Sequence, residues 1–343
     1  MIQALVAQAP ARRWRGDSRR RRWWSFSITV LLVSGVWLGG AAAAEQRRGP
    51  VLIGALTHSW GPTPAVVGLR DGLLDLGHRE GETFVIGVRF TQGDAGALPA
   101  AARELVQHGA EILFATGGNE AKAAQMATER LPIVFVVGSD PVALGLVQRL
   151  NRPGGNLTGL ASLDIELAPK RLELFREIVP GLKRVLLPYD ATDAYAVSQL
   201  SLYREAARRL GLALVEKPAR TQEQAQMIIA RARKSGVDGI LSPRLISLNI
   251  PGFMLEAATA IPTMFHGAFY VERGGLASYA ASDYELGRQA ARFVNKIVKG
   301  TKPAELPVEQ ATKFKLVINL KTAKTLGLSI PQPVLLRADE IIQ

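Results

Sequence analysis

The chain has 343 residues, a formal net charge of +12 and no cysteine. The lack of cysteine excludes disulfides, thiolate metal sites and a cysteine nucleophile, and it also excludes a lipid-modified cysteine after a leader. The length exceeds what a single hydrophobic core normally supports, so we expect two domains.

The first 44 residues have the layout of a secretory signal peptide. Four arginines at 19–22 precede an apolar stretch at 28–38, and small residues follow, with Ala42 and Ala44 in an A-x-A cleavage pattern. The apolar stretch is shorter than the about 20 residues that span a bilayer, so an uncleaved anchor is the less favoured alternative. General secretion and twin-arginine export both stay open. We expect a periplasmic protein.

Much of the positive charge belongs to this leader. Removal of residues 1–44 takes away seven Arg and one Asp and lowers the formal net charge from +12 to +6. The remaining basic residues fall mostly on predicted helix faces, where such residues usually serve solubility. We therefore expect no nucleic-acid partner.

From residue 50 onward, short apolar runs alternate with helical patterns in two successive rounds. Such short runs are long enough for buried strands and too short for helices. The first round predicts strands at 51–56, 84–90, 111–115, 133–137 and 157–160, and helices at 66–76, 98–107 and 120–129. The second predicts helices at 168–179, 194–210, 222–234 and 253–260, and strands at 184–187, 213–216, 239–241 and 263–265. This alternation is typical of parallel, doubly wound sheets.

The segment after residue 275 is too short to bury a core of its own. It contains an extended piece at 276–279, a helix at 284–299, a strand at 315–318 and a short helix at 321–326. We place the long helix on the first lobe and the last strand and helix on the second, with crossings near 160, 279 and 308. The predicted fold is α/β, with two doubly wound parallel-sheet lobes joined by a three-crossing hinge. The predicted lobes are 45–160 plus 280–307, and 161–279 plus 308–343. A ligand would bind in the cleft of this clamshell, at the carboxyl ends of strands.

Several sequence motifs match a known family across almost the whole chain after the leader. They are Asp140-Pro141-Val142 and the runs at 152–159, 170–174, 274–279, 302–310, 313–323 and 337–340. With these motifs the chain resembles the substrate-binding proteins of ABC transporters, in the group of tryptophan/tyrosine-type uptake proteins. The resemblance implies the type I periplasmic-binding-protein fold and a small amino-acid-like ligand that is delivered to a membrane permease.

The chain departs from that family at two strand ends that face the predicted cleft. Residues 118–121 read Gly-Asn-Glu-Ala where the family often has Gly-Thr-Pro-Ala, and residues 242–244 read Ser-Pro-Arg where it often has Pro-Asp-Pro. These departures leave the fold expectation unchanged and leave the identity of the ligand open.

Candidate ligand-binding residues on the first lobe follow its strands. Thr116, Gly118 and Asn119 join the third strand to a helix whose free N–H groups favour a carboxylate, although Asn119 as a simple helix cap is the alternative. The negative charge of Glu120 in the first turn argues against an anionic ligand there. Ser139 and Asp140 follow the fourth strand, where capping by Asp140 is equally plausible. Trp60, after the first strand, is expected to stack on the ligand.

On the second lobe, Asp190 follows a strand and is expected to hold an ammonium group, with Tyr189 or Tyr195 stacking on it. Asp193 fits a helix cap. Further candidates are Ser242 and His266 at strand ends and Ser278 and Asp283 at a hinge crossing. His58 also follows a strand, but an isolated histidine is more often a surface or satisfied core residue than a ligand contact.

These observations favour an extracytoplasmic solute-binding component of an ABC importer that has no catalytic activity. We expect a monomer that binds a small molecule and permease subunits and needs no cofactor or metal. A periplasmic ligand sensor for a receptor or sensor kinase is the alternative. An exported hydrolase is less favoured, because the chain lacks H-E-x-x-H, G-x-S-x-G and phosphate-loop motifs. A sugar-responsive repressor would need an N-terminal DNA-binding motif where this chain has a leader.

Overall fold

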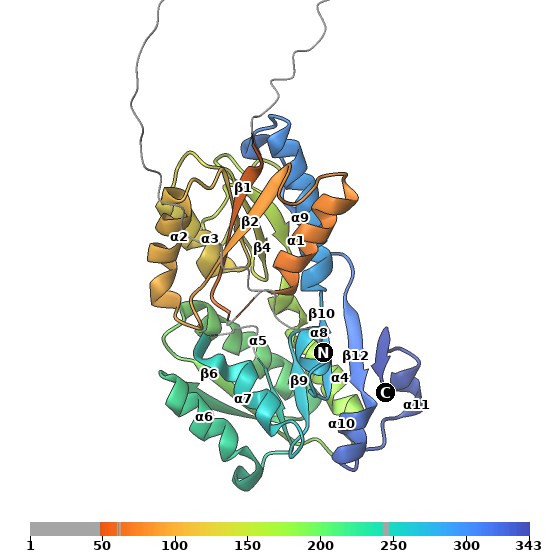
Figure 1. Ribbon diagram of the computed structural model, residues 1–343. Helices are drawn as coiled ribbons and strands as arrows, with labels where there is room; N and C mark the ends of the chain where they lie inside the picture. Colours follow the sequence, from red (N-terminus) through yellow and green to blue (C-terminus); the bar gives the residue numbers. More distant parts are fainter. Residues whose placement is uncertain (1–48, 60, 62, 243–246) are drawn as a thin grey trace, which may run out of the picture. The chain divides into compact units, whose positions relative to one another are not determined.

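The computed structural model describes residues 49–59, 61, 63–242 and 247–343 (Figure 1). The predicted leader, Trp60 and the departure at Pro243 and Arg244 lie outside these residues. Residues 47–343 form one compact unit. Two β-sheets organise it, and each has helices packed on both faces.

The first sheet has six strands, all parallel, as the alternation of strands and helices predicted. In spatial order they are β11 (Glu309–Gln310), β5 (Leu157–Ala161), β4 (Ile133–Val137), β3 (Ile112–Ala115), β1 (Val51–Thr57) and β2 (Phe84–Phe90). Its helices are α1 (Pro64–Asp75), α2 (Leu98–Gln107), α3 (Gly118–Ala127) and α9 (Asp283–Val298). Successive residues of β3 alternate between the cluster under α1 and α9 and the cluster under α2 and α3, so the sheet is buried on both faces.

The second sheet has seven strands. In spatial order they are β13 (Glu340–Ile342), β12 (Lys315–Asn319), β10 (Ala277–Ala280), β9 (Thr263–Phe265), β8 (Gly239–Leu241), β6 (Arg184–Asp190) and β7 (Ala213–Ala219). Its helices are α4 (Ala168–Ile178), α5 (Ala194–Leu210), α6 (Gln222–Ala230), α7 (Ile250–Ala257), α8 (Ala268–Val271), α10 (Leu320–Thr325) and α11 (Gln332–Leu335). Among the described pairings of this sheet, only the one between β10 and β12 is antiparallel, so β12 and β13 run opposite to the other five strands, which departs from the predicted parallel sheet. β12 arrives from the other sheet without a crossover helix, so nothing forces it to be parallel.

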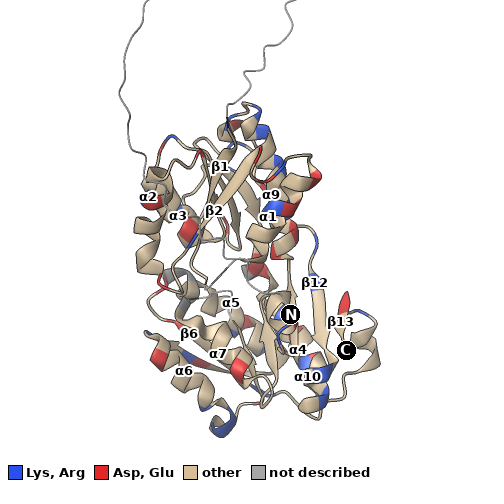
Figure 2. Ribbon diagram, in the orientation of Figure 1, with Lys and Arg blue, Asp and Glu red and all other residues tan. Residues whose placement is uncertain are grey.

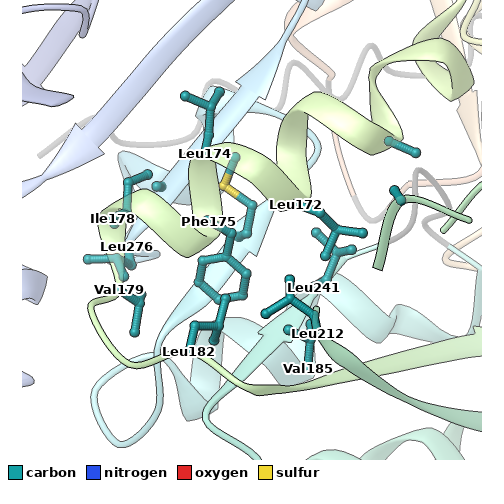
Figure 3. Packing of buried hydrophobic residues seen from close by; sticks show 14 of the residues in the cluster. Leu172, Leu174, Phe175, Ile178, Val179, Leu182, Val185, Leu212, Leu241 and Leu276 are labelled. Atoms are coloured by element: carbon teal, nitrogen blue, oxygen red, sulfur yellow. The ribbon is translucent and has the colours of Figure 1, made fainter. Parts of the chain in front are cut away.

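The second sheet is held between these helices by apolar side chains packed on both of its faces. Phe175 of α4 is fully buried and points toward Leu182, with Leu212 and Leu241 beside it (Figure 3). Gly239 of β8 lies under the same ring, and a Cβ at this position would overlap it. The second face is covered by α6 and α7, whose Ile229 and Met254 pack in a separate cluster.

The chain passes between the two sheets three times. It leaves the six-stranded sheet after β5, returns between β10 and α9, and leaves again between β11 and β12. The last crossing comes after Gln310, later than the predicted boundary at 308, because the two-residue strand β11 still pairs with β5. A polar pair such as Glu309–Gln310 carries no apolar pattern that could reveal a strand.

Charged residues of both signs occur on the helices around both sheets (Figure 2). None of the helices in the described part of the chain is both long and apolar enough to cross a membrane.

Candidate ligand-binding edges

Both sheets repeat the same strand order, β2-β1-β3-β4-β5 in the first and β7-β6-β8-β9-β10 in the second. In this doubly wound order the chain changes direction across the sheet between β1 and β3, and between β6 and β8. Ligands of such folds bind outside the carboxyl ends of the strands at that point. The residues that follow β1, β3, β6 and β8 therefore form the candidate site.

The edge of the first sheet holds a buried ion pair that the sequence did not reveal. Nδ1 of His58, directly after β1, lies 2.5 Å from Oε1 of Glu120, and the backbone N–H of His58 donates to the same oxygen at 3.3 Å. The side chains of His58 and Glu120 are 9% and 1% exposed. Since Glu120 stands 62 positions away in the first turn of α3, only the adjacency of β1 and β3 brings the two together.

The pair shifts the titration of both groups. Burial acts to lower the pKa of His58, but the charge and hydrogen bond of Glu120, with a smaller contribution from the charge of Asp193, raise it above its usual value. Burial likewise acts to raise the pKa of Glu120, and the imidazolium and two backbone N–H groups outweigh this and lower it. The electrostatic partner therefore decides both directions, and the pair favours its charged form.

This pair predicts a pH window for stability. The contribution of His58 is complete below its usual pKa of 6.5 and is lost as pH rises through its raised pKa. The contribution of Glu120 is complete above its usual pKa of 4.5 and is lost as pH falls through its lowered pKa. We expect the difference in unfolding free energy between the native chain and the double variant His58→Gln/Glu120→Gln to be largest between these two values. Urea unfolding across pH measures it, and a difference that does not vary with pH contradicts the prediction.

The other predicted residues of this edge have mostly local contacts. Thr116 is half-buried and its hydroxyl donates to the carbonyl of Leu56 at 3.3 Å. Gly118 and Asn119 are the first two residues of α3, with Gly117 at the cap position, so the alternative of Asn119 as the cap is wrong. Asn119 is exposed.

The residues after β4 form a turn. Ser139 is 6% exposed, whereas Asp140 is exposed and its Oδ1 accepts the N–H of Val142 at 2.8 Å. Residues 141–145 continue as turns, so Asp140 does not cap a helix. The hydrogen bond of Asp140 stabilises the turn, and its contact with a ligand stays a prediction.

The edge of the second sheet begins with Asp190, the last residue of β6. Asp190 is 5% exposed, and its Oδ1 accepts from the backbone N–H and the hydroxyl of Thr192 at 2.8 and 2.6 Å. Asp193 accepts the N–H of Ala196 at 3.2 Å, as expected for a helix cap. Tyr189 is half-buried and packs against the core beneath α4 and α5, and its stacking on a ligand stays a prediction.

Two neighbouring strand ends continue this edge. The hydroxyl of Ser242, after β8, lies 3.0 Å from Nδ1 of His266, after β9, and both residues are buried. The ring of Tyr270 stands 5.2 Å from the ring of His266. The structure thus places Asp190, Ser242 and His266 at the ends of adjacent strands of one sheet, and their contact with a ligand stays a prediction.

The hinge residues lie beside a small cavity. Ser278 on β10 is 1% exposed and its hydroxyl has no hydrogen-bond partner among the described residues. It lines a cavity of about 210 Å³, together with the start of α8, the crossing at 280–282 and Lys315. Asp283 is the first residue of α9 and is half-buried.

Residues 59–342 match the family described as ABC transporter substrate binding protein. The chain belongs to this family. The membership confirms the prediction of a substrate-binding protein rather than an enzyme, since the similar proteins are binding proteins.

Similar proteins come from three bacteria. A tyrosine-binding protein of Clostridioides difficile is 26% identical over 263 residues, which cover 76% of each chain. A conserved domain protein from Vibrio cholerae is 33% identical with a TM-score of 0.75, over 85% of this chain and 99% of that one. A Streptococcus pneumoniae domain in complex with L-Trp is 26% identical with a TM-score of 0.75, over 85% and 100%. The fold is the type I periplasmic-binding-protein fold that the sequence predicted.

Proposed function

We propose that this protein is the extracytoplasmic substrate-binding component of an ABC importer. It captures a small amino-acid-like ligand between the carboxyl edges of its two sheets and delivers it to the permease as a monomer, after export directed by residues 1–44. The sheets with their helices act as lobes, and the three crossings act as the hinge. Closure then follows from ligand contacts to both lobes at once.

The observation that carries this proposal is the presence of buried, charged groups at the switch point of both sheets. His58 and Glu120 mark the first edge and Asp190 marks the second. Buried charges are expensive unless they are paired or used, and Asp190 has only neutral partners among the contacts described. An ammonium group is the chemistry that satisfies such a carboxylate. The tyrosine-binding and L-Trp-bound relatives support an aromatic amino acid as the ligand.

A ligand screen tests this function. The chain from residue 45 onward, which retains the compact unit 47–343, is heated with amino acids, aromatic carboxylates, short peptides and sugars. A ligand at 100 times its dissociation constant adds about 2.7 kcal/mol of stability, so a true ligand raises the unfolding temperature clearly. We expect an aromatic amino acid to do so. A response to sugars alone contradicts the proposed ligand class.

A variant pair locates the ligand. Replacement of Asp190 by Asn keeps its size and removes its charge, so we expect amino-acid affinity to fall by roughly tenfold to a hundredfold. Asp75→Asn is the matched control, because Asp75 ends α1 on the surface and pairs only with Arg288 in the contacts described. Isothermal titration calorimetry measures both. Equal affinities in the two variants would exclude Asp190 from the site.

A further inference from the structure

We propose that the His58–Glu120 pair receives the carboxylate of a zwitterionic ligand, an α-amino acid, whose ammonium group faces the acidic edge of the seven-stranded sheet. The inference rests on the proposed function, because it assigns the two ends of the ligand that such a protein captures. It also makes ligand binding a proton-linked event.

The helix N-terminus at this edge is already occupied by the protein itself. Glu120 is the third residue of α3 and is 1% exposed, and its Oε2 stands so close over Gly117 that a Cβ there would overlap it. Its carboxylate accepts the backbone N–H of His58. A ligand carboxylate aimed at the start of α3 would meet this buried negative charge and be repelled.

His58 is the group at this edge that can donate a hydrogen bond to a ligand carboxylate, in place of the backbone N–H groups at the start of α3. Its Nδ1 is held by Glu120, which leaves Nε2 without a partner among the described residues, while 9% of the side chain stays exposed. A carboxylate partner fixes Nδ1 as a donor, so Nε2 carries a hydrogen only in the imidazolium form. The protonated ring therefore presents one charge-assisted N–H to a ligand oxygen, whereas the neutral ring presents a lone pair that repels it.

The charged groups that act on His58 come from two elements. In the described chain they are Glu120 on α3 and Asp193, which precedes α5 on the other sheet. The negative charge of Asp193, at the edge of the seven-stranded sheet, contributes to the raised pKa of His58 at the edge of the six-stranded sheet. The two edges therefore interact electrostatically. Asp190 adds a second buried carboxylate beside it. A ligand with a negative end at His58 and a positive end toward Asp190 and Asp193 complements this arrangement, and an α-amino acid has both ends.

Calorimetry across pH tests the inference on the whole protein. L-tryptophan and L-tyrosine serve as probes between about pH 5.5 and 8.5, and tryptamine and tyramine are their counterparts without a carboxylate. Above the pKa of His58, the dissociation constants of the amino acids should rise by up to about tenfold per pH unit, with uptake of one proton on binding. The amines should bind without this proton uptake. Titration in two buffers of different ionisation enthalpy counts the protons.

Two variants identify the titrating group. His58→Gln should weaken amino-acid binding at low pH and remove its pH dependence, whereas His108→Gln, which replaces an exposed histidine after α2, should leave both unchanged. If His58→Gln does not fold, the test rests on the native protein, where proton uptake should accompany binding of the amino acids and not binding of the amines. Amino-acid binding that is independent of pH, or a pH dependence that survives in His58→Gln, overturns this inference and leaves the proposed function standing. Absence of amino-acid binding at every pH overturns both.

Discussion

Replacement of Arg171 by Met is expected to lower the free energy of unfolding by about 3–5 kcal/mol, because it leaves the buried carboxylate of Asp164 without its cation. Arg171 on α4 is fully buried and pairs with Asp164, which is 1% exposed at its side chain. Its Nε donates to the carbonyl of Tyr279 at 2.7 Å. Asp164 lies in the first crossing between the sheets and Tyr279 on β10 just before the second, so one guanidinium ties two hinge segments together.

Urea unfolding of three variants tests this expectation. Lys170→Ala is the control, since Lys170 is the neighbouring residue and makes a partly exposed surface pair with Glu173, and surface pairs contribute less than about 1 kcal/mol. The double variant Asp164→Asn/Arg171→Met should recover part of the loss, because it removes both buried charges. If Arg171→Met is as stable as Lys170→Ala, the ion pair does not hold the hinge segments.

Replacement of Gly287 by Ala is expected to destabilise the protein by roughly 2 kcal/mol or more, although Ala is the better helix former. Helix propensity alone predicts a gain of about 1 kcal/mol. A Cβ at Gly287 of α9, however, would overlap the backbone carbonyl of Ala65 on α1. Gly68 of α1 meets the carbonyl of Tyr284 on α9 in the same way. Because backbone atoms cannot rotate away, the two helices would have to separate, and overpacking of this kind costs about 1–3 kcal/mol or more.

The control for this variant lies on the same helix. Gln289 is exposed on α9, so Gln289→Ala should change stability by no more than about 0.5 kcal/mol. Urea midpoints with unchanged slopes give the comparison. An increase in stability of Gly287→Ala would mean that propensity outweighs the close approach of α1 and α9, which lie side by side in Figure 1.

Several elements could be predicted from the sequence because burial leaves a direct trace in it. The strands predicted at 133–137 and 263–265 coincide with β4 and β9, since a strand buried on both faces must be apolar along its whole length. The helix predicted at 194–210 coincides with α5 for a related reason, because its apolar residues recur at the helical period over a long stretch. The order of these elements sufficed to predict two doubly wound sheets.

Short elements at the sheet edges could not be predicted. β11 has two polar residues, and β13 and α11 have three and four residues, so each of them is too short for a pattern of apolar residues to repeat. Each exists because a neighbouring strand or core offers unpaired backbone groups or apolar surface. The antiparallel direction of β12 depends likewise on where the chain re-enters the second sheet.

The candidate site also has some features that could be predicted from the sequence and others that could not. Sequence alone determined which residues follow strands, and it thereby placed Asp190, Ser242 and His266 at one edge and Thr116 and Ser139 at the other. It also indicated that the charge of Glu120 disfavours an anion at the start of α3. Only the tertiary structure decided that Glu120 pairs with His58 and that Arg171 donates to the carbonyl of Tyr279. These two contacts depend on strand order and chain crossings, which bring together residues 62 and 108 positions apart, and no local pattern in a sequence encodes them.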